Sequence, residues 1–213
     1  MRIPRVTSLL LVAIAAGYAL QLLLGPRFEL ALALWPLGPH QVGTLDGQPI
    51  AVGFAPWQLV TYAFLHGDAT HLLFNGLALY MFGSRIERAF GARRFTAYWF
   101  ACVLGAALAQ LATLAILEPG RMSPTIGASG GVFGLLLAFG MMYPRERIIL
   151  LFPPIPMPAW LFVTGYGVVE LVLGVTGTQS GVAHFAHLGG LVAGFLVLAW
   201  WRFLRRAGRG NPR

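Results

Sequence analysis

Six apolar segments of membrane-spanning length constrain this chain more than any other feature of its sequence. A helix that crosses a bilayer needs about 17–25 predominantly apolar residues. Segments of this kind lie at about 8–24, 70–86, 95–117, 128–143, 159–177 and 183–203. Charged residues make up only 10% of the chain, whereas a soluble domain usually carries about 25%. The sequence therefore predicts an all-α membrane protein, with residues 1–213 forming a single polytopic domain.

The arginines predict how these segments are oriented, because basic residues concentrate in short cytoplasmic loops. If the N-terminus is cytoplasmic, 13 of the 15 basic residues fall on the cytoplasmic side, and only Arg27 and Arg121 lie outside. Both termini are then cytoplasmic, including a basic tail at about 204–213. The net charge of +8 follows from topology, so we do not expect nucleic-acid binding. A bacterial cytoplasmic membrane is the expected location.

The first segment resembles a signal peptide but is too long to be one. Arg2 and Arg5 precede an apolar run that contains Ala13-Ile14-Ala15, which mimics a cleavage site. The run continues to Leu24, whereas the apolar region of a signal peptide is typically about 7–15 residues. We therefore expect an uncleaved first span. The single cysteine, Cys102, lies in an apolar stretch and is expected to be a small core residue.

The connection over residues 25–69 is the longest stretch between predicted spans. Its segments "FELALALWPL" and "FAPWQLVTYAFLHG" are apolar and aromatic but too short to span. Such segments indicate interfacial structure, so we expect a long, partly membrane-embedded external loop between the first two helices. The alternative is a loosely ordered external loop. On the opposite side, the prolines of "PRERIILLFPPIPMP" preclude a regular helix.

Polar side chains recur at one depth in alternate spans. The second span opens with His71 and Asn75, four residues apart and therefore on one helix face. Ser129 opens the fourth span, and His184 and His187 open the sixth. All three spans enter from the outside, so these groups lie near the outer surface. Polar groups inside a membrane are costly, which makes each of them a candidate functional residue.

Small residues predict how the serine and a histidine meet. Small residues four apart let membrane helices approach closely, and a close contact between the fourth and sixth spans would bring the Ser129 hydroxyl to the His187 ring. The fourth span is also short, at about 22 Å against a hydrocarbon core of about 30 Å. We therefore expect "MSPTIGA" to dip into the membrane beside a water-filled cavity, where the first helical amides could bind an oxyanion. The small residues are Gly127, Gly130, Gly131 and Gly134 in the fourth span and Ala186, Gly190 and Gly194 in the sixth.

These motifs together resemble the rhomboid intramembrane serine proteases. The resemblance covers roughly residues 50–203. It consists of "HLLFN" in the second span, "GASG" opening the fourth and "AHLGGLVAG" in the sixth. It also includes the spacing W-x(8)-H-x(4)-H-x(3)-N from Trp57 to Asn75 and the "ERAFG" that ends the second span. Three motifs in matching order on alternate spans are specific to this family.

The resemblance implies a six-helix bundle and a role for each matching residue. Ser129 matches the nucleophile and His187 the general base of a two-residue dyad. His71, Asn75 and the Ser129 backbone amide match the oxyanion site. Gly127 matches the glycine of the serine motif, and His66 a structural loop histidine. The implied activity is cleavage of single-pass transmembrane proteins in or near the bilayer, with no cofactor and no metal.

Two positions depart from the family pattern. The loop usually carries an arginine after its tryptophan, where this chain has Gln58, so the hydrogen bonding of the loop is in question. Four residues after the nucleophile some members carry a tyrosine that stacks on the catalytic histidine. Phe133 keeps a ring for stacking but lacks the hydroxyl.

Three other functions are weighed against this one. Gly127–Gly131 fits the G-x-S-x-G elbow of soluble hydrolases, but that elbow needs a preceding strand and an acidic partner. A rhomboid-like protein that escorts membrane helices typically lacks the serine or the histidine, and both are present. A zinc enzyme would need ligands such as the four histidines at the outer depth, but no carboxylate is expected beside them. Those histidines are His66, His71, His184 and His187.

Two further polar residues are expected to be structural. Glu170, inside the fifth span, is expected to be neutral or hydrogen-bonded to another helix. Nothing in the sequence places it near Ser129, so no catalytic role is expected. His184 is expected to be a structural neighbour of His187.

Overall fold

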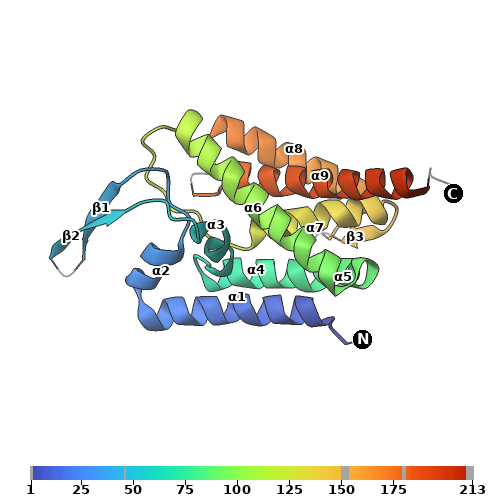
Figure 1. Ribbon diagram of the computed structural model, residues 1–213, viewed down its shortest axis with the longest axis horizontal. Helices are drawn as coiled ribbons and strands as arrows, with labels where there is room; N and C mark the ends of the chain where they lie inside the picture. The colour runs from blue at the N-terminus through green and yellow to red at the C-terminus, as the bar shows by residue number, and fades with distance from the viewer. Residues whose placement is uncertain (1, 46, 150–153, 179–180, 210–213) are drawn as a thin grey trace.

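Helices that run side by side make up most of the structure (Figure 1). The computed structural model describes residues 2–45, 47–149, 154–178 and 181–209. The helices are α1 (Arg5–Leu24), α2 (Pro26–Leu32), α3 (Gln58–Thr61), the 3₁₀ turn η1 (Tyr62–Phe64), α4 (Ala69–Ala78), the π-helical η2 (Leu79–Gly83), α5 (Ser84–Phe90), α6 (Ala92–Ile116), α7 (Ser129–Met142), α8 (Ala159–Thr176) and α9 (His184–Arg209). Two antiparallel hairpins pair β1 (His40–Leu45) with β2 (Gln48–Val52) and β3 (Arg147–Ile149) with β4 (Pro156–Pro158).

Four helices in the described residues, α1, α6, α8 and α9, are long and apolar enough to cross a membrane. α7 is apolar but shorter, as expected from the sequence. α4, η2 and α5 follow one another without a break from residue 69 to residue 90. Every segment predicted to be an apolar helix is helical, with ends close to those predicted. The largest difference is at α9, which continues to Arg209 into the predicted basic tail.

Helix ends are set by local residues. The Asp68 side chain accepts a hydrogen bond from the His71 backbone N–H at 2.8 Å and so caps α4. α5 ends at Gly91, which has a φ of 76° that residues with a Cβ rarely adopt. Pro158 precedes α8, where a missing N–H costs no helical hydrogen bond. Of these three ends, the Asp68 cap fixes the start of α4, where His71 and Asn75 lie, and the other two lie at the opposite end of the bundle.

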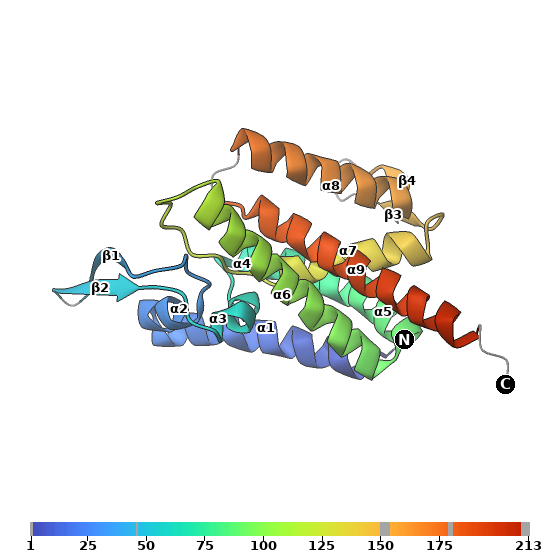
Figure 2. The same cartoon turned by 45° about the horizontal axis from the view of Figure 1, so that its top comes forward.

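α6, α7 and α9 form the centre of the molecule, and small residues set how closely they pack. α6 makes its most extensive contacts with α9, and α9 also packs along α7, with α8 on its outer side (Figure 2). A Cβ at Gly190 of α9 would overlap the Gly130 backbone of α7, whose carbonyl carbon would lie 2.9 Å away. A Cβ at Gly134 would lie 2.7 Å from the Cys102 Cβ on α6. The predicted contact between the fourth and sixth spans is therefore present, and Cys102 is a buried core residue as expected.

A buried carboxylate joins α1 to α5 at the end where both termini lie. Glu87 is almost fully buried. Its carboxylate accepts hydrogen bonds from the Val6 N–H at 2.9 Å, the Thr7 N–H at 2.7 Å and the Thr7 hydroxyl at 2.7 Å. N–H groups in the first turn of a helix have no helical partner. Glu87 supplies one for α1, so the "ERAFG" motif has a structural purpose here.

The connection over residues 25–69 is ordered within the described residues and packs on the bundle. It contains α2, the β1–β2 hairpin, α3 and η1, where the sequence indicated interfacial structure. Gln21 of α1 holds its far end: the Gln21 side chain accepts from the His66 N–H at 2.8 Å and donates to the His66 carbonyl at 3.3 Å. The connection is therefore fixed to the bundle at both ends.

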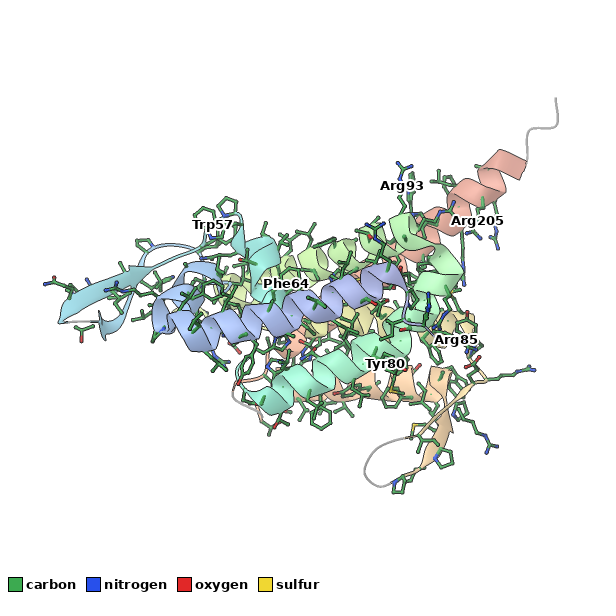
Figure 3. All side chains as sticks on the ribbon, turned by 90° about the horizontal axis from the view of Figure 1, so that it is seen from below. Trp57, Phe64, Tyr80, Arg85, Arg93 and Arg205 are labelled. Atoms are coloured by element: carbon green, nitrogen blue, oxygen red, sulfur yellow. The ribbon has the colours of Figure 1, made fainter. Side chains whose placement is uncertain are left out.

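The two ends of the bundle differ in residue type. Arg85, Arg93 and Arg205 lie at one end, and Trp57 lies at the other (Figure 3). The N- and C-terminal ends of the described chain lie at the arginine end (Figure 1). The β3–β4 hairpin, formed by the proline-rich turn, is also there. This distribution agrees with the arginine pattern of the sequence.

The close contact between α7 and α9 predicts that Gly190→Ala destabilises the protein. The new methyl group overlaps the Gly130 carbonyl, and overpacking costs about 1–3 kcal/mol. The matched control is Gly167→Ala in α8, where a Cβ meets only the Leu191 side chain at 3.5 Å. Thermal unfolding in detergent should show a lower midpoint for Gly190→Ala and an unchanged or higher midpoint for the control. A midpoint of Gly190→Ala equal to that of the wild type would contradict the close packing of α7 and α9.

Candidate active site

The chain is fixed on both sides immediately before Ser129. Thr125 and Leu34 exchange backbone hydrogen bonds at 2.9 and 3.0 Å, forming an isolated bridge to the external connection. The Gly127 N–H donates to the Tyr62 carbonyl at 2.9 Å. Thr125 and Ala128 are buried, so this segment enters the protein rather than lying on its surface. α7 then begins at Ser129, which places the hydroxyl at the start of that helix.

Ser129 and His187 are in direct contact. The His187 Nε2 lies 2.8 Å from the Ser129 Oγ, although the two residues are 58 positions apart in the chain. His187 is in the first turn of α9, and its partner is the first residue of α7. The helix contact through Gly130 and Gly190 lies next to this pair. The sequence predicted this contact from the small residues and the common depth.

An aromatic ring, Phe133, supports the His187 ring. Phe133 stacks on it with a centroid distance of 4.3 Å and an interplanar angle of 10°. Tyr166 of α8 in turn contacts Phe133, with ring centroids 5.0 Å apart. Phe133 is one helical turn after Ser129, so α7 supplies both the hydroxyl and the supporting ring. The stacking expected from the sequence is present without the hydroxyl of a tyrosine.

Glu170 corrects an expectation from the sequence. Its Oε2 lies 2.9 Å from the His187 Nδ1 and 2.6 Å from the His184 Nδ1. Glu170 and His184 are buried. The expectation that Glu170 binds another helix is confirmed, but the statement that nothing places it near Ser129 is wrong. One histidine ring separates the carboxylate from the serine hydroxyl.

The hydrogen-bond network assigns the tautomer of His187. With Glu170 ionised, its carboxylate can only accept hydrogen bonds, so the ring Nδ1 carries the proton and donates it to Glu170. In a neutral imidazole this leaves Nε2 as an acceptor. The Ser129 hydroxyl then donates to His187 Nε2 across 2.8 Å. This is the arrangement in which the ring can take up the serine proton.

His71 lies close to the same serine, and Asn75 follows it one helical turn later in α4. The Gly67 N–H donates to the His71 Nδ1 at 3.4 Å, so the His71 proton is on Nε2. A Cβ at Gly127 would lie 2.8 Å from that Nε2 and 3.7 Å from the Ser129 Oγ. Gly127 also has a φ of 123°, so the position excludes side chains for two reasons. Asn75 donates one amide proton to the His71 carbonyl at 3.0 Å and has a second to offer.

A cavity of about 1280 Å³ opens over these residues. Ser129, His187, His71 and Asn75 line it, together with Gly127 and Phe133. The rest of its wall includes side chains of α4, η2, α8 and the β3–β4 hairpin, and most of them are apolar. The space is large enough for part of a peptide chain together with water.

Comparison with known proteins agrees with this geometry. A rhomboid domain is matched over residues 54–204. This chain belongs to the rhomboid family. RHOMBOID-like protein 4 of Arabidopsis thaliana is 34% identical over 166 residues, which cover 76% of this chain and 39% of that protein. Rhomboid protease AarA of Providencia stuartii is 30% identical over 155 residues, or 66% of this chain and 54% of its own length.

A third relative, rhomboid protease GluP of Bacillus subtilis, is 30% identical over 146 residues. These cover 67% of this chain and 25% of that protein. The chain thus spans about half or less of the length of these curated relatives. Family and composition together make the chain an integral membrane protein of a protease family. The relatives include mitochondrial proteins as well as bacterial ones.

Gln58 restores hydrogen bonding where the rhomboid pattern has an arginine. Its buried side chain accepts from the Trp35 N–H at 3.2 Å and the Ala55 N–H at 3.1 Å. It also donates to the Gly53 carbonyl at 3.2 Å. The amide therefore satisfies three backbone groups of the external connection. The question that the sequence raised about this loop is answered by these bonds.

Glu170, His184 and His187 also offer a set of possible metal ligands. One ligand atom of each lies within 4.8 Å of the others. The expectation that no carboxylate accompanies the histidines is therefore wrong. The same atoms are already hydrogen-bonded among themselves, and the remaining His187 nitrogen contacts Ser129. A metal there would replace those hydrogen bonds, which chelation can test.

His66 predicts a pH dependence of stability. Burial, with a smaller contribution from His71, lowers the pKa of His66 to about 4 from 6.5. The unfolded chain therefore binds this proton more readily than the folded one, so acid stabilises the unfolded state. The contribution of the neutral His66 to the free energy of unfolding should be fully present above about pH 6.5 and should be lost as the pH drops toward 4. Thermal midpoints at about pH 7 and 5 should differ more in the wild type than in His66→Gln. An equal drop in both would show that other groups cause it.

Proposed function

We propose that this protein is an intramembrane serine endopeptidase. The observation that carries the proposal is the 2.8 Å contact between the Ser129 hydroxyl and His187 Nε2, at the wall of a large cavity. Ser129 is the nucleophile and His187 is the general base. A serine in a membrane helix usually has only a packing role. Packing does not explain why this serine contacts a histidine nitrogen, why Phe133 stacks on that histidine, or why a cavity opens at the same point.

The chemistry follows from the positions of the protons. As Ser129 Oγ bonds to the substrate carbonyl carbon, its proton passes to His187 Nε2 and the carbonyl π electrons move to the oxygen. The resulting oxyanion accepts from the His71 Nε2–H, the free amide proton of Asn75 and the Ser129 N–H at the start of α7. The oxyanion then re-forms the carbonyl, the C–N bond breaks, and His187 gives its proton to the leaving amine nitrogen. In the second half of the reaction water gives a proton to His187 and attacks the acyl carbon. The bond to Ser129 Oγ then breaks, and His187 returns the proton to that oxygen.

The substrates we propose are single-pass transmembrane proteins cleaved in or near the bilayer. Counted with α7 and the stretch from α4 to α5, the candidate spans in the described part of the chain number six, which fits termini on the cytoplasmic side. The start of α7 then faces the outer side. The cavity wall contains Phe74 and Met81 from one side and Leu161 and Val169 from the other. These side chains suit an apolar segment that enters between α4 and α8 and unwinds at Ser129.

Labelling with a fluorophosphonate tests the nucleophile. We expect this serine-directed probe to modify Ser129 and no other serine, as mapped by mass spectrometry. Ser129→Ala should abolish cleavage of a model transmembrane substrate, since no other group at this point can form the acyl bond. Its thermal midpoint should stay near that of the wild type, because the change removes one oxygen atom.

Two controls separate this proposal from its rivals. EDTA should leave cleavage unchanged, and loss of activity restored by zinc would replace the dyad with a metal mechanism. Binding of a transmembrane peptide without any cleavage or labelling would instead make the protein an escort of membrane helices.

Asn75→Ala tests the oxyanion site separately. A donor aimed at the oxyanion acts more strongly in the transition state than on bound substrate. Removing one such donor costs about 10²–10³ in kcat in a soluble protease. We expect a fall of about 10–1,000-fold, because His71 and the Ser129 amide share the charge, with KM nearly unchanged. Steady-state kinetics in liposomes measure both. A raised KM with kcat intact would place Asn75 in substrate binding instead.

A further inference from the structure

Glu170 is a carboxylate buried in a helix of spanning length. Only 3% of its surface is exposed. Carboxylates inside a membrane are costly and need partners. Both partners of Glu170 come from α9: the Nδ1 atoms of His184 and His187, at 2.6 and 2.9 Å from the same oxygen, Oε2. Glu170 is therefore costly to bury, and it contacts the proposed general base. The question is what this carboxylate does for His187.

The hydrogen bond supplies what the aromatic stack cannot. Stacking of Phe133 on His187 with an interplanar angle of 10° fixes the plane of the imidazole ring. A stacked ring can still rotate within its own plane, and it can carry its proton on either nitrogen. A bond from Nδ1–H to Glu170 fixes the rotation and the tautomer together. Nε2 is then held unprotonated and directed at Ser129 Oγ.

We propose that Glu170 is a positioning residue that extends the Ser129–His187 pair into a hydrogen-bonded triad. It holds the neutral ring in the reactive tautomer, and its negative charge offsets the positive charge that His187 gains when it takes the serine proton. This role rests on the proposed protease function. Glu170 touches neither substrate nor Ser129, so it acts through His187 alone.

His184 holds the carboxylate in place. It donates to the same oxygen as His187 does and lies three residues earlier on α9, on the same helix face. Two donors from one helix fix the position of Oε2 better than one. Because Glu170 belongs to α8, the two bonds also join α8 to α9 at the level of the active site. α8 therefore contributes to catalysis although it supplies no reacting atom.

Charge and shape are separated by two substitutions of the same residue. Glu170→Gln keeps the length of the side chain but removes its charge. Glu170→Asp keeps the charge but shortens the side chain. A structural role predicts that the isosteric glutamine is the milder change. A role through charge predicts the reverse, because only a carboxylate stabilises the protonated His187 ring.

The matched control is Glu87→Gln. Glu87 is also buried and accepts three hydrogen bonds, but it lies at the other end of the bundle, between α5 and α1. The control should lower the thermal midpoint and leave kcat for the folded protein unchanged. It therefore reports what loss of a buried carboxylate does to folding alone.

The experiment measures kcat, KM and the fluorophosphonate labelling rate for each full-length variant in liposomes. In a soluble serine protease, changing the corresponding carboxylate to an amide lowers kcat by about 10⁴. We expect a fall of about 10–1,000-fold in Glu170→Gln, because Phe133 still holds the ring plane, with KM changed by less than about twofold. Glu170→Asp should retain at least about ten times the kcat of Glu170→Gln.

The possible outcomes separate this proposal from the protease function itself. Wild-type kcat in Glu170→Gln, or a glutamine variant at least as active as the aspartate variant, would overturn the role of Glu170 while leaving Ser129 as nucleophile. Activity that survives in Ser129→Ala would overturn the protease mechanism. Inhibition by EDTA that zinc reverses would show that Glu170 and the two histidines bind a metal instead, and it would also overturn the positioning role.

Discussion

Contact between two helix backbones, that of Gly190 on α9 and that of Gly130 on α7, determines the distance on which the active site depends. A side chain at Gly190 would overlap the Gly130 carbonyl, so glycine is what lets these helices approach. Ser129 precedes Gly130 and His187 lies one turn before Gly190, so the same approach sets the separation of Oγ and Nε2 at 2.8 Å. In a bilayer no hydrophobic effect between helices drives this association, and close packing of small residues has to supply the attraction.

Much of this site was predictable because the positions of its residues within the apolar segments indicate their depth in the membrane. His71, Ser129 and His187 each fall near the start of an alternate apolar segment, and the predicted alternation of spans places these starts on one side of the membrane. Phe133 follows Ser129 by one helical turn, so its place beside the histidine ring follows from helix geometry. Resemblance to the rhomboid family added the roles, which apolar patterning alone does not provide. The helix boundaries followed from the lengths of the apolar segments.

Glu170 escaped prediction for a physical reason. α8 is apolar on all sides, so its pattern does not indicate which face meets α9. The sequence placed Glu170 inside the fifth span, but it did not indicate the direction of the side chain around the helix axis. A signal was nevertheless present: an ionisable residue in one span and two histidines three apart in the next all needed buried partners. Pairing Glu170 with these two histidines would have predicted the contact between α8 and α9. Likewise, the three bonds of Gln58 depend on backbone groups of Gly53, Ala55 and Trp35, whose positions no local pattern gives.

The bridge between Leu34 and Thr125 shows that the packed unit of this protein extends beyond the region matched by the rhomboid domain. Leu34 lies before the matched rhomboid domain, which begins at residue 54, and Thr125 lies inside it, four residues before Ser129. Thr7, bound to Glu87, is likewise outside the matched region. A chain cut back to the boundaries of sequence similarity would therefore keep every proposed catalytic group. It would lose the Leu34–Thr125 bridge just before Ser129 and, at the other end of the bundle, the Thr7–Glu87 bonds that join α1 to α5. The segment that resembles other rhomboid proteins is therefore shorter than the segment whose contacts hold the fold together.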